Sequence, residues 1–252
     1  MTTPRVMLRL TFGVIVCIAC AARPQDTFGP AAPPGAPSTA FPAPSRRVAD
    51  IVAPRWTNED SRDDAGEFAR VATLAGVHQG ARVADIGAGD GYYVVRLAPL
   101  VGESGRVFGE DIMVDYLRLL QQRVQRGRLH NVQVVLGDTH DPRLPTASIE
   151  MAFMIHMYHE IGQPFGVLWN LATAMQPHGH LVILDLERPT FGHGTTPSLL
   201  RCELAAVGYR ELSFTKTGAE EYVAIFEAPS AEMRPSVSTL RTQLGAHPCI
   251  AP

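Results

Sequence analysis

The stretch expected to decide the fold is Val83-Ala84-Asp85-Ile86-Gly87-Ala88-Gly89-Asp90-Gly91-Tyr92. A short, mostly apolar segment suited to a buried strand runs directly into glycines at alternate positions, and a helical pattern follows. Because glycine lacks a Cβ, the backbone here is able to turn sharply and to approach a ligand closely. In an open parallel sheet, ligands bind beyond the carboxyl ends of the strands, which is where this turn is predicted to lie.

Strand and helix patterns alternate along the chain on either side of this glycine loop. Strands are predicted over residues 82–86, 106–111, 132–136, 149–155 and 180–186. Helices are predicted over residues 61–75, 92–100, 114–126, 164–175 and 198–207. Two further alternating segments, 209–216 and 221–227, predict a closing antiparallel hairpin. This order is typical of an α/β protein whose parallel strands are covered by helices on both faces.

The two ends of the chain differ in composition from this central part. Basic residues, an apolar stretch and then small residues predict a secretory signal peptide over 1–22, with cleavage near Ala19 to Ala22. Lipidation at Cys20 and an uncleaved N-terminal anchor are the alternatives. A Pro/Ala-rich segment over 23–47 predicts a disordered linker, and 230–252 a flexible tail. The expected domain is therefore 48–229, in an exported protein of the periplasm or envelope.

Composition and charge restrict the possible partners. The chain of 252 residues is 46% hydrophobic, which suits one substantial domain. A formal net charge of -3 offers no basic excess for a nucleic-acid backbone, so a small-molecule substrate is expected and a nucleic acid is not. Two cysteines lie in the apolar leader, and Cys202 and Cys249 lie far downstream. This spacing predicts neither structural zinc nor a readable disulfide framework. The oligomeric state is left open.

Acidic residues follow three successive predicted strands and indicate the kind of cofactor. Asp111 lies about 20 residues beyond the glycine loop, at the position from which a carboxylate binds ribose hydroxyls. Asp85 and Asp90 bracket the loop and would repel a pyrophosphate, but they suit the ammonium and sulfonium groups of S-adenosylmethionine. Asp138 follows the third strand, where a carboxylate is able to accept a hydrogen bond from adenine.

The order of these motifs resembles that of class I S-adenosylmethionine-dependent methyltransferases. The resemblance rests on Ala84 to Gly91, Gly109-Glu110-Asp111-Ile112, Gly137-Asp138 and Met175 to Ile183, and it spans most of 61–229. It implies a Rossmann-like, seven-stranded, mostly parallel sheet that ends in an antiparallel hairpin. The residues expected to bind S-adenosylmethionine are Asp85, Gly87, Gly89, Gly91, Tyr92, Asp111, Ile112 and Asp138.

The resemblance also implies a role for several of these residues. Asp85 and the glycines are expected near the methionine part of the cofactor, Asp111 on ribose and Asp138 near adenine. The sequence departs from the family around Gly179, where His178 and His180 replace the usual proline and basic residue. This departure concerns the entry to a strand and leaves the cofactor residues unaffected.

The segment after the fourth predicted strand, Ile155 to Glu160, is expected beside the transferred methyl group. His156 and His159 are the candidate catalytic bases, since the unperturbed pKa of histidine lies near neutral pH. Local hydrogen bonding at a strand-to-helix turn is the alternative interpretation of both. Their spacing matches no zinc signature, so no metal is expected. The loop over 187–197 either closes over substrate or is an ordinary surface loop.

The sequence therefore predicts an enzyme that moves a methyl group from S-adenosylmethionine to a small, unidentified acceptor. An NAD-dependent oxidoreductase and a non-catalytic module that binds S-adenosylmethionine are the alternatives. Export is in tension with this cofactor, because S-adenosylmethionine is a cytosolic metabolite.

Overall fold

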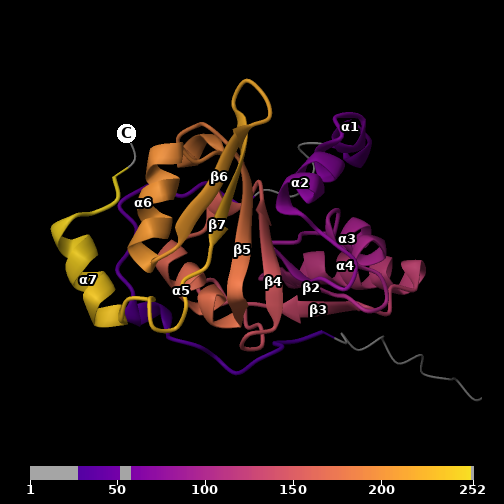
Figure 1. The fold of residues 1–252 in the computed structure, drawn as a ribbon, viewed down its shortest axis with the longest axis horizontal. Coiled ribbons are helices and arrows are strands. Elements are labelled where there is room, and N and C mark those ends of the chain that lie inside the picture. The colour runs from indigo at the N-terminus through magenta and orange to yellow at the C-terminus, as the bar shows by residue number, and fades with distance from the viewer. Residues whose placement is uncertain (1–27, 52–57, 251–252) are drawn as a thin grey trace, which may run out of the picture.

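The structure is a computed structural model that describes residues 28–51 and 58–250 (Figure 1). The predicted signal peptide and residues 23–27 lie outside the described residues. The centre of the described part is a seven-stranded sheet in the order β3-β2-β1-β4-β5-β7-β6. The strands are β1 Arg82–Ile86, β2 Arg106–Asp111, β3 Val132–Leu136, β4 Ile149–Ile155, β5 Met175–Leu186, β6 Arg210–Lys216 and β7 Glu221–Glu227.

The pairing of the strands confirms the predicted Rossmann-like sheet. β1 pairs in parallel with β2 and β4, and β3 and β5 extend the parallel region on the two sides. β7 then inserts antiparallel between β5 and β6, which is the closing hairpin expected from the sequence. The carboxyl ends of β1, β2 and β4 consequently meet along one edge of the sheet.

Helices cover both faces of the sheet, as predicted. They are α1 Glu59–Asp64, α2 Glu67–Ala75, α3 Val94–Val101, α4 Val114–Gly127, α5 Pro164–Ala174, α6 Pro197–Val207 and α7 Val237–Ala246, with short 3-10 helices η1 Ser38–Ala40, η2 Tyr158–Glu160 and η3 Thr190–Gly192. Successive strand side chains point to opposite faces, so Val83 packs in the apolar cluster under α3 and α4. Ala84 packs in the cluster under α5 and α6. Figure 1 shows these two groups of helices on opposite sides of the sheet.

Two elements differ from the prediction by more than a shift of one or two residues at an end. The helix expected over 61–75 is divided into α1 and α2 because Gly66 adopts a left-handed conformation with φ of 62°. Asn58 caps α1 by accepting a hydrogen bond from the Ser61 amide. β5 begins at Met175 rather than at residue 180, and a register shift in its pairing with β4 accommodates the added residues.

The prediction of a disordered linker is wrong for residues 28–47. Phe41 is buried and its ring lies 5.9 Å from that of Trp169. The Gly35 amide donates to the Asp141 carboxylate, and the neighbouring amide of Ala36 donates to Asn170. Tertiary contacts of a few residues therefore order a segment whose average composition is typical of disorder.

The prediction of a flexible tail is wrong for residues 230–250. This segment contains α7, which buries Leu240 against the apolar cluster that α5 and α6 share. A disulfide joins Cys202 of α6 to Cys249, with 5.6 Å between the Cα atoms. The sequence did not reveal this pair because its members are 47 residues apart. Within the described segments, we find no helix long and apolar enough to span a bilayer.

Candidate active site

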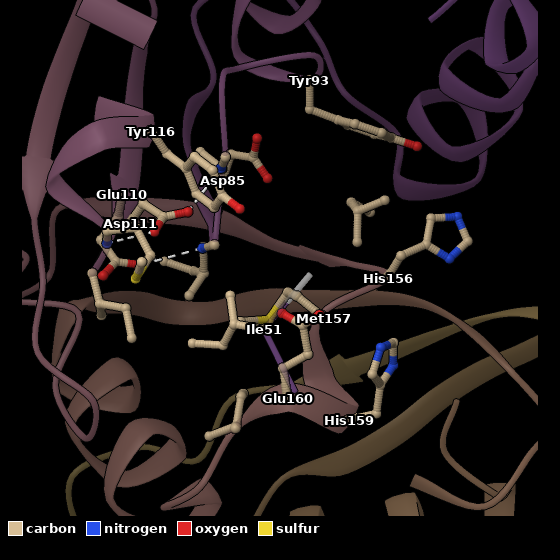
Figure 2. A pocket seen from close by; sticks show the side chains of 18 of the residues that line it. Ile51, Asp85, Tyr93, Glu110, Asp111, Tyr116, His156, Met157, His159 and Glu160 are labelled. Carbon is tan, nitrogen blue, oxygen red and sulfur yellow. Dashed lines mark hydrogen bonds between the residues drawn. The ribbon is translucent and has the colours of Figure 1, made fainter. Parts of the chain in front are cut away.

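A cavity of about 1020 Å³ opens at the carboxyl ends of β1, β2 and β4 (Figure 2). The glycine loop and the end of β2 form one end of it, and the loop after β4 forms the other. Residues of α1, α2 and the N-terminal segment contribute further walls. Small-molecule sites usually occupy about 300 to 1,000 Å³. A cavity of this size has room for a cofactor and an acceptor together.

The glycine loop requires glycine for two separate reasons. Gly87, Gly89 and Gly91 have positive φ angles of 69°, 57° and 96°, a region that other residues seldom adopt. A Cβ on Gly91 would lie 2.3 Å from Leu120 Cδ1, and a Cβ on Gly87 would lie 2.8 Å from Met157 Cε. The loop therefore packs tightly on α4 and against the segment that carries the candidate histidines.

Asp111 binds the backbone of the glycine loop. Its carboxylate accepts hydrogen bonds of 2.8 Å from the amides of Gly89 and Met113. Burial raises the pKa of Asp111, although these backbone bonds oppose the shift. Each carboxylate oxygen has a second lone pair, so Asp111 is able to hold the loop and also to accept from a ribose hydroxyl.

Two further buried carboxyl groups lie beside Asp111. Burial raises the pKa of Asp85 to about 8, with Arg62 lowering it and Asp111 raising it. Burial and the neighbouring Asp111 raise the pKa of Glu110 well above its ordinary value. A cation placed among these groups would favour their ionised forms, so this end of the cavity suits a positively charged ligand.

Sequence analysis assigned no role to Glu110, although the residue belongs to the quoted motif. Its carboxylate occupies the space that a Cβ on Gly137 would fill, with only 1.7 Å between them. The Gly87 amide approaches the same carboxylate at 3.4 Å. The sequence signal that could have indicated this contact is the acidic pair Glu110-Asp111 at the end of one strand, together with Gly137 directly after the neighbouring strand.

Gly91 packs on Leu120 and does not line the cavity, whereas the remaining predicted cofactor residues do line it. Ile112 and Asp138 lie on its wall, and the half-exposed Asp138 carboxylate contacts Arg143 at 3.4 Å. The Tyr92 hydroxyl donates to Asp63 at 2.8 Å, and its ring lies 3.8 Å from the Arg62 guanidinium carbon. Tyr92 therefore fastens α1 beside the cavity through both its hydroxyl and its ring.

His156 has an unusual backbone and a charged partner. Its φ of 54° is uncommon for a residue with a side chain and often marks a functional site. Its Nε2 lies 3.4 Å from Glu67 Oε2. Burial favours the neutral form of Glu67, yet hydrogen bonds with His156 and Arg62 lower its pKa to about 2. An ionised carboxylate thus faces the imidazole.

His159 is buried three residues further along the chain, in η2. Its Nδ1 lies 3.0 Å from Oδ1 of the fully buried Asp185, on β5. The ring of His193, from the loop after β5, lies 5.5 Å from that of His159. Sequence analysis missed His193, since no motif within its loop indicates that it reaches the cavity.

Comparisons with known proteins support the same family. A family model described as a methyltransferase domain matches residues 77–215, more than half of the chain. The chain is 29% identical over 118 residues to the ubiquinone/menaquinone biosynthesis C-methyltransferase UbiE of Azotobacter vinelandii, covering 46% of this chain and 47% of that protein. It is 26% identical over 154 residues to a demethylmenaquinone methyltransferase of Geobacillus stearothermophilus, covering 58% and 66%. The matches thus span less than two thirds of these curated relatives.

A solved structure shows the same fold. The S-adenosylmethionine-dependent methyltransferase of Aquifex aeolicus superposes with a TM-score of 0.63 at 23% identity, covering 67% of this chain and 93% of that one. The strand order, the glycine loop at the end of β1 and the family model agree. The chain belongs to the class I S-adenosylmethionine-dependent methyltransferases.

Proposed function

We propose that the protein catalyses transfer of a methyl group from S-adenosylmethionine to a small acceptor. The observation that carries this proposal is the group of three buried carboxyl groups, Asp85, Glu110 and Asp111, around the glycine loop. S-adenosylmethionine supplies a methyl group that its positively charged sulfur already activates for displacement. The task left to the protein is to hold the two reactants in line and to exclude water.

The cavity has a cofactor end, formed by the glycine loop with Asp85, Glu110 and Asp111, and a histidine end, formed by the loop after β4. Each end performs one part of this task. The carboxylates and the loop amides bind and orient the cofactor. His156 is in place to take a proton from the acceptor, because the Glu67 carboxylate would stabilise the imidazolium that forms. The names of the curated relatives specify quinone-pathway acceptors for those proteins, which favours trying hydroxylated aromatic compounds first.

The buried carboxylates also weigh against the alternative of an NAD-dependent oxidoreductase. A dinucleotide would place its pyrophosphate at the glycine loop, where it would keep Asp85 and Glu110 protonated, whereas a cationic ligand would stabilise their ionised forms. The second alternative, a non-catalytic binding module, predicts cofactor binding without turnover. A binding measurement therefore tests the oxidoreductase alternative, and an activity measurement tests the non-catalytic module.

Calorimetry with S-adenosylmethionine, S-adenosylhomocysteine and NAD, followed by a screen of small acceptors, tests the proposal. We expect one equivalent of either adenosyl ligand to bind, no NAD to bind, and S-adenosylhomocysteine to form with at least one acceptor. The absence of binding by both adenosyl ligands would refute the proposal. Binding without turnover across the screen would favour the non-catalytic module.

We also propose that the protein is exported. Support comes from the leader sequence and from the Cys202–Cys249 disulfide, since disulfides persist mainly in oxidising compartments. Cell fractionation and determination of the mature N-terminus test the proposal. An intact Met1 on protein from the cytosolic fraction would contradict it.

A further inference from the structure

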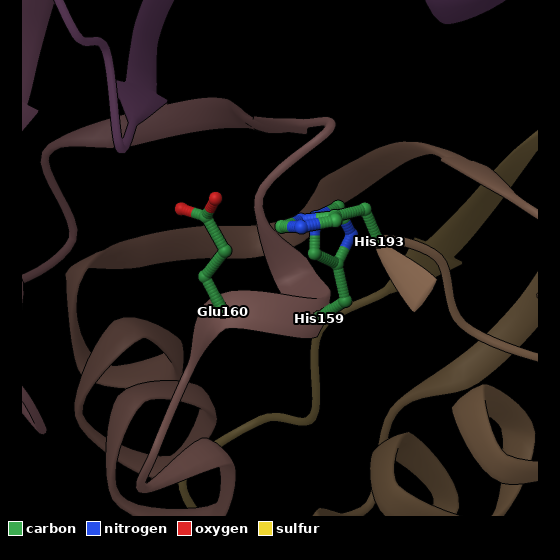
Figure 3. A group of neighbouring side chains, drawn as sticks. All are labelled: His159, Glu160 and His193. Atoms are coloured by element: carbon green, nitrogen blue, oxygen red, sulfur yellow. The ribbon is translucent and has the colours of Figure 1, made fainter. Parts of the chain in front are cut away.

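Three side chains with metal-binding atoms converge at the histidine end of the cavity (Figure 3). His159 and Glu160 come from η2, and His193 from the loop after β5. One ligand atom of each lies within 4.8 Å of the others. We propose that these three residues, called here the His–Glu–His group, bind a divalent transition metal of the Zn²⁺ type.

The donor set fits this class of metal. Two imidazoles and one carboxylate form the ligand set of many catalytic zinc sites, in which a fourth position stays open for water or substrate. Bonds of about 2.1 Å place tetrahedral ligand atoms roughly 3.4 Å apart. The ligand atoms lie within 4.8 Å of one another, so metal binding would require the side chains to move closer together. The cavity supplies space for the open position, because all three residues line it.

Asp185 orients His159, one of the three proposed metal ligands. Its carboxylate accepts from the His159 Nδ1, so the other ring nitrogen keeps its lone pair for a metal. Ligating histidines commonly have such a carboxylate partner, which fixes the ring orientation. Asp185 is fully buried, and its Oδ2 has no hydrogen-bond partner among the described residues. A cation held through His159 would compensate this buried charge.

A second cluster, formed by Glu67, His156 and Glu221, suits a metal less well. The Arg62 guanidinium binds Glu67 at 2.5 Å, and Arg70 binds Glu221 at 3.0 Å. Both carboxylates therefore already have a positive partner that a metal ion would have to displace. The His–Glu–His group differs from this cluster in having the buried carboxylate of Asp185 bonded to one of its ligands, His159.

A metal at this position defines the class of acceptor. An acceptor hydroxyl would occupy the open position, and the metal would lower the pKa of that hydroxyl. The contact between Met157 and the glycine loop places this site next to the cofactor end. This role in binding the acceptor rests on the proposed function, whereas metal binding itself does not.

Cobalt titration of the untagged, chelator-treated protein tests the proposal, because bound Co²⁺ reports its ligands through its visible spectrum. We expect one equivalent of Co²⁺ to give a tetrahedral or five-coordinate spectrum that Zn²⁺ abolishes. His193→Ala and Glu160→Gln should each weaken binding at least tenfold. Asp185→Asn should weaken it 10- to 100-fold, as is usual for loss of the partner of a ligating histidine.

Two histidine variants serve as matched controls. His156→Ala, in the second cluster, and His178→Ala, on an exposed side chain at the opposite end of β5, should leave Co²⁺ binding unchanged. Circular dichroism confirms that each variant folds, and Glu160→Gln keeps the proposal testable if His193→Ala does not fold. Absence of a stoichiometric Co²⁺ spectrum would overturn the proposal and leave His159 and Asp185 as a buried ion pair.

Calorimetry with S-adenosylhomocysteine on the same samples keeps the two proposals separate. Metal binding without cofactor binding would refute the methyltransferase proposal alone. Cofactor binding without metal binding would refute the metal site alone. Loss of Co²⁺ binding in His156→Ala but not in His193→Ala would also overturn the metal site, because it would move the metal to the second cluster.

Discussion

The cofactor end and the histidine end of the cavity are built in different ways (Figure 2). At the cofactor end, backbone amides of the glycine loop bind carboxylates of β2, so main-chain geometry fixes the site. At the histidine end, side chains from separate loops meet, and the buried carboxylates of Glu67 and Asp185 orient them. One cavity thus combines a part that tolerates little change with a part whose side chains are able to vary with the acceptor.

This comparison predicts that changes at one end leave the other end intact. The largest effect is expected for His156→Ala, because loss of a positioned general base usually costs 10²- to 10⁴-fold in rate. The affinity for S-adenosylhomocysteine should stay within about twofold, since the carboxylate that His156 bonds is Glu67, at the other end of the cavity. Turnover with an acceptor found in the screen, together with calorimetry, provides the measurement.

His178→Ala is the matched control for this change. The His178 side chain is exposed and bonded to Glu227 at the far end of β5. Its removal should alter neither the rate nor the affinity. If His156→Ala retains full turnover, the assignment of His156 as the base is wrong.

The next largest effect is expected on the free energy of unfolding when the disulfide near the histidine end is removed. The Cys202–Cys249 disulfide holds α7 on α6, and α6 directly follows the loop that carries His193. Cys202→Ser with Cys249→Ser should lower the free energy of unfolding by about 2 to 4 kcal/mol. Urea unfolding with and without reductant measures this loss.

Hydrogen exchange then locates the effect of the disulfide. Amides of α6 should exchange faster in the double variant, whereas amides of β1 and β2 should not change. Reductant should destabilise the wild type and have no effect on the double variant. An unchanged urea midpoint in reduced wild type would show that the disulfide does not stabilise the fold.

The same contrast explains which features were predictable from sequence. The bounds of β1, β2, β3, β4 and β7 were predicted to the residue, because strand patterns and the glycine loop are local signals. Asp111 was placed at its strand end by spacing alone. The fold and the position of Asp111 at the edge of the sheet were therefore predictable from the sequence.

The features that were missed depend on contacts between distant residues. Phe41 orders the N-terminal segment by packing on Trp169, and Cys249 orders the C-terminal segment by bonding to Cys202. His193 reaches His159 only because the loop after β5 folds back to the cavity. Composition averages over such residues, so it predicted disorder at both ends of the chain where the structure has packed segments.

At the cofactor end, Asp111→Ala is expected to weaken binding of S-adenosylhomocysteine by about 1.5 to 3 kcal/mol, or roughly 10- to 150-fold. The change removes a ribose acceptor and also the group that binds the amides of Gly89 and Met113. Asp115→Ala is a matched control, because this carboxylate is exposed on α4 and pairs with Arg118 of the same helix. Calorimetry should detect no change in the control, and unchanged affinity in Asp111→Ala would mean that the ribose lies elsewhere.

The last prediction is a pH dependence that belongs to the cofactor end alone. Burial raises the pKa of Asp85 from an ordinary 3.8 to about 8, so the folded protein retains a proton there that the unfolded chain loses near pH 4. The stability that this proton contributes is complete below about pH 4 and is lost as the pH rises through 8. Asp85→Asn should therefore gain stability relative to the wild type between pH 4 and 8.

Cofactor binding should show the complementary trend. A cationic ligand needs the ionised carboxylate of Asp85, so the affinity for S-adenosylhomocysteine, whose ammonium group is positive, should rise by up to about tenfold per pH unit from pH 6 to 8. The rise should be shallower in Asp85→Asn, because Glu110 and Asp111 alone would then contribute to it. Binding of Co²⁺ by His159, Glu160 and His193 should not respond to Asp85→Asn at any pH. An equal pH dependence of cofactor affinity in the variant and the wild type would remove Asp85 from the cation site.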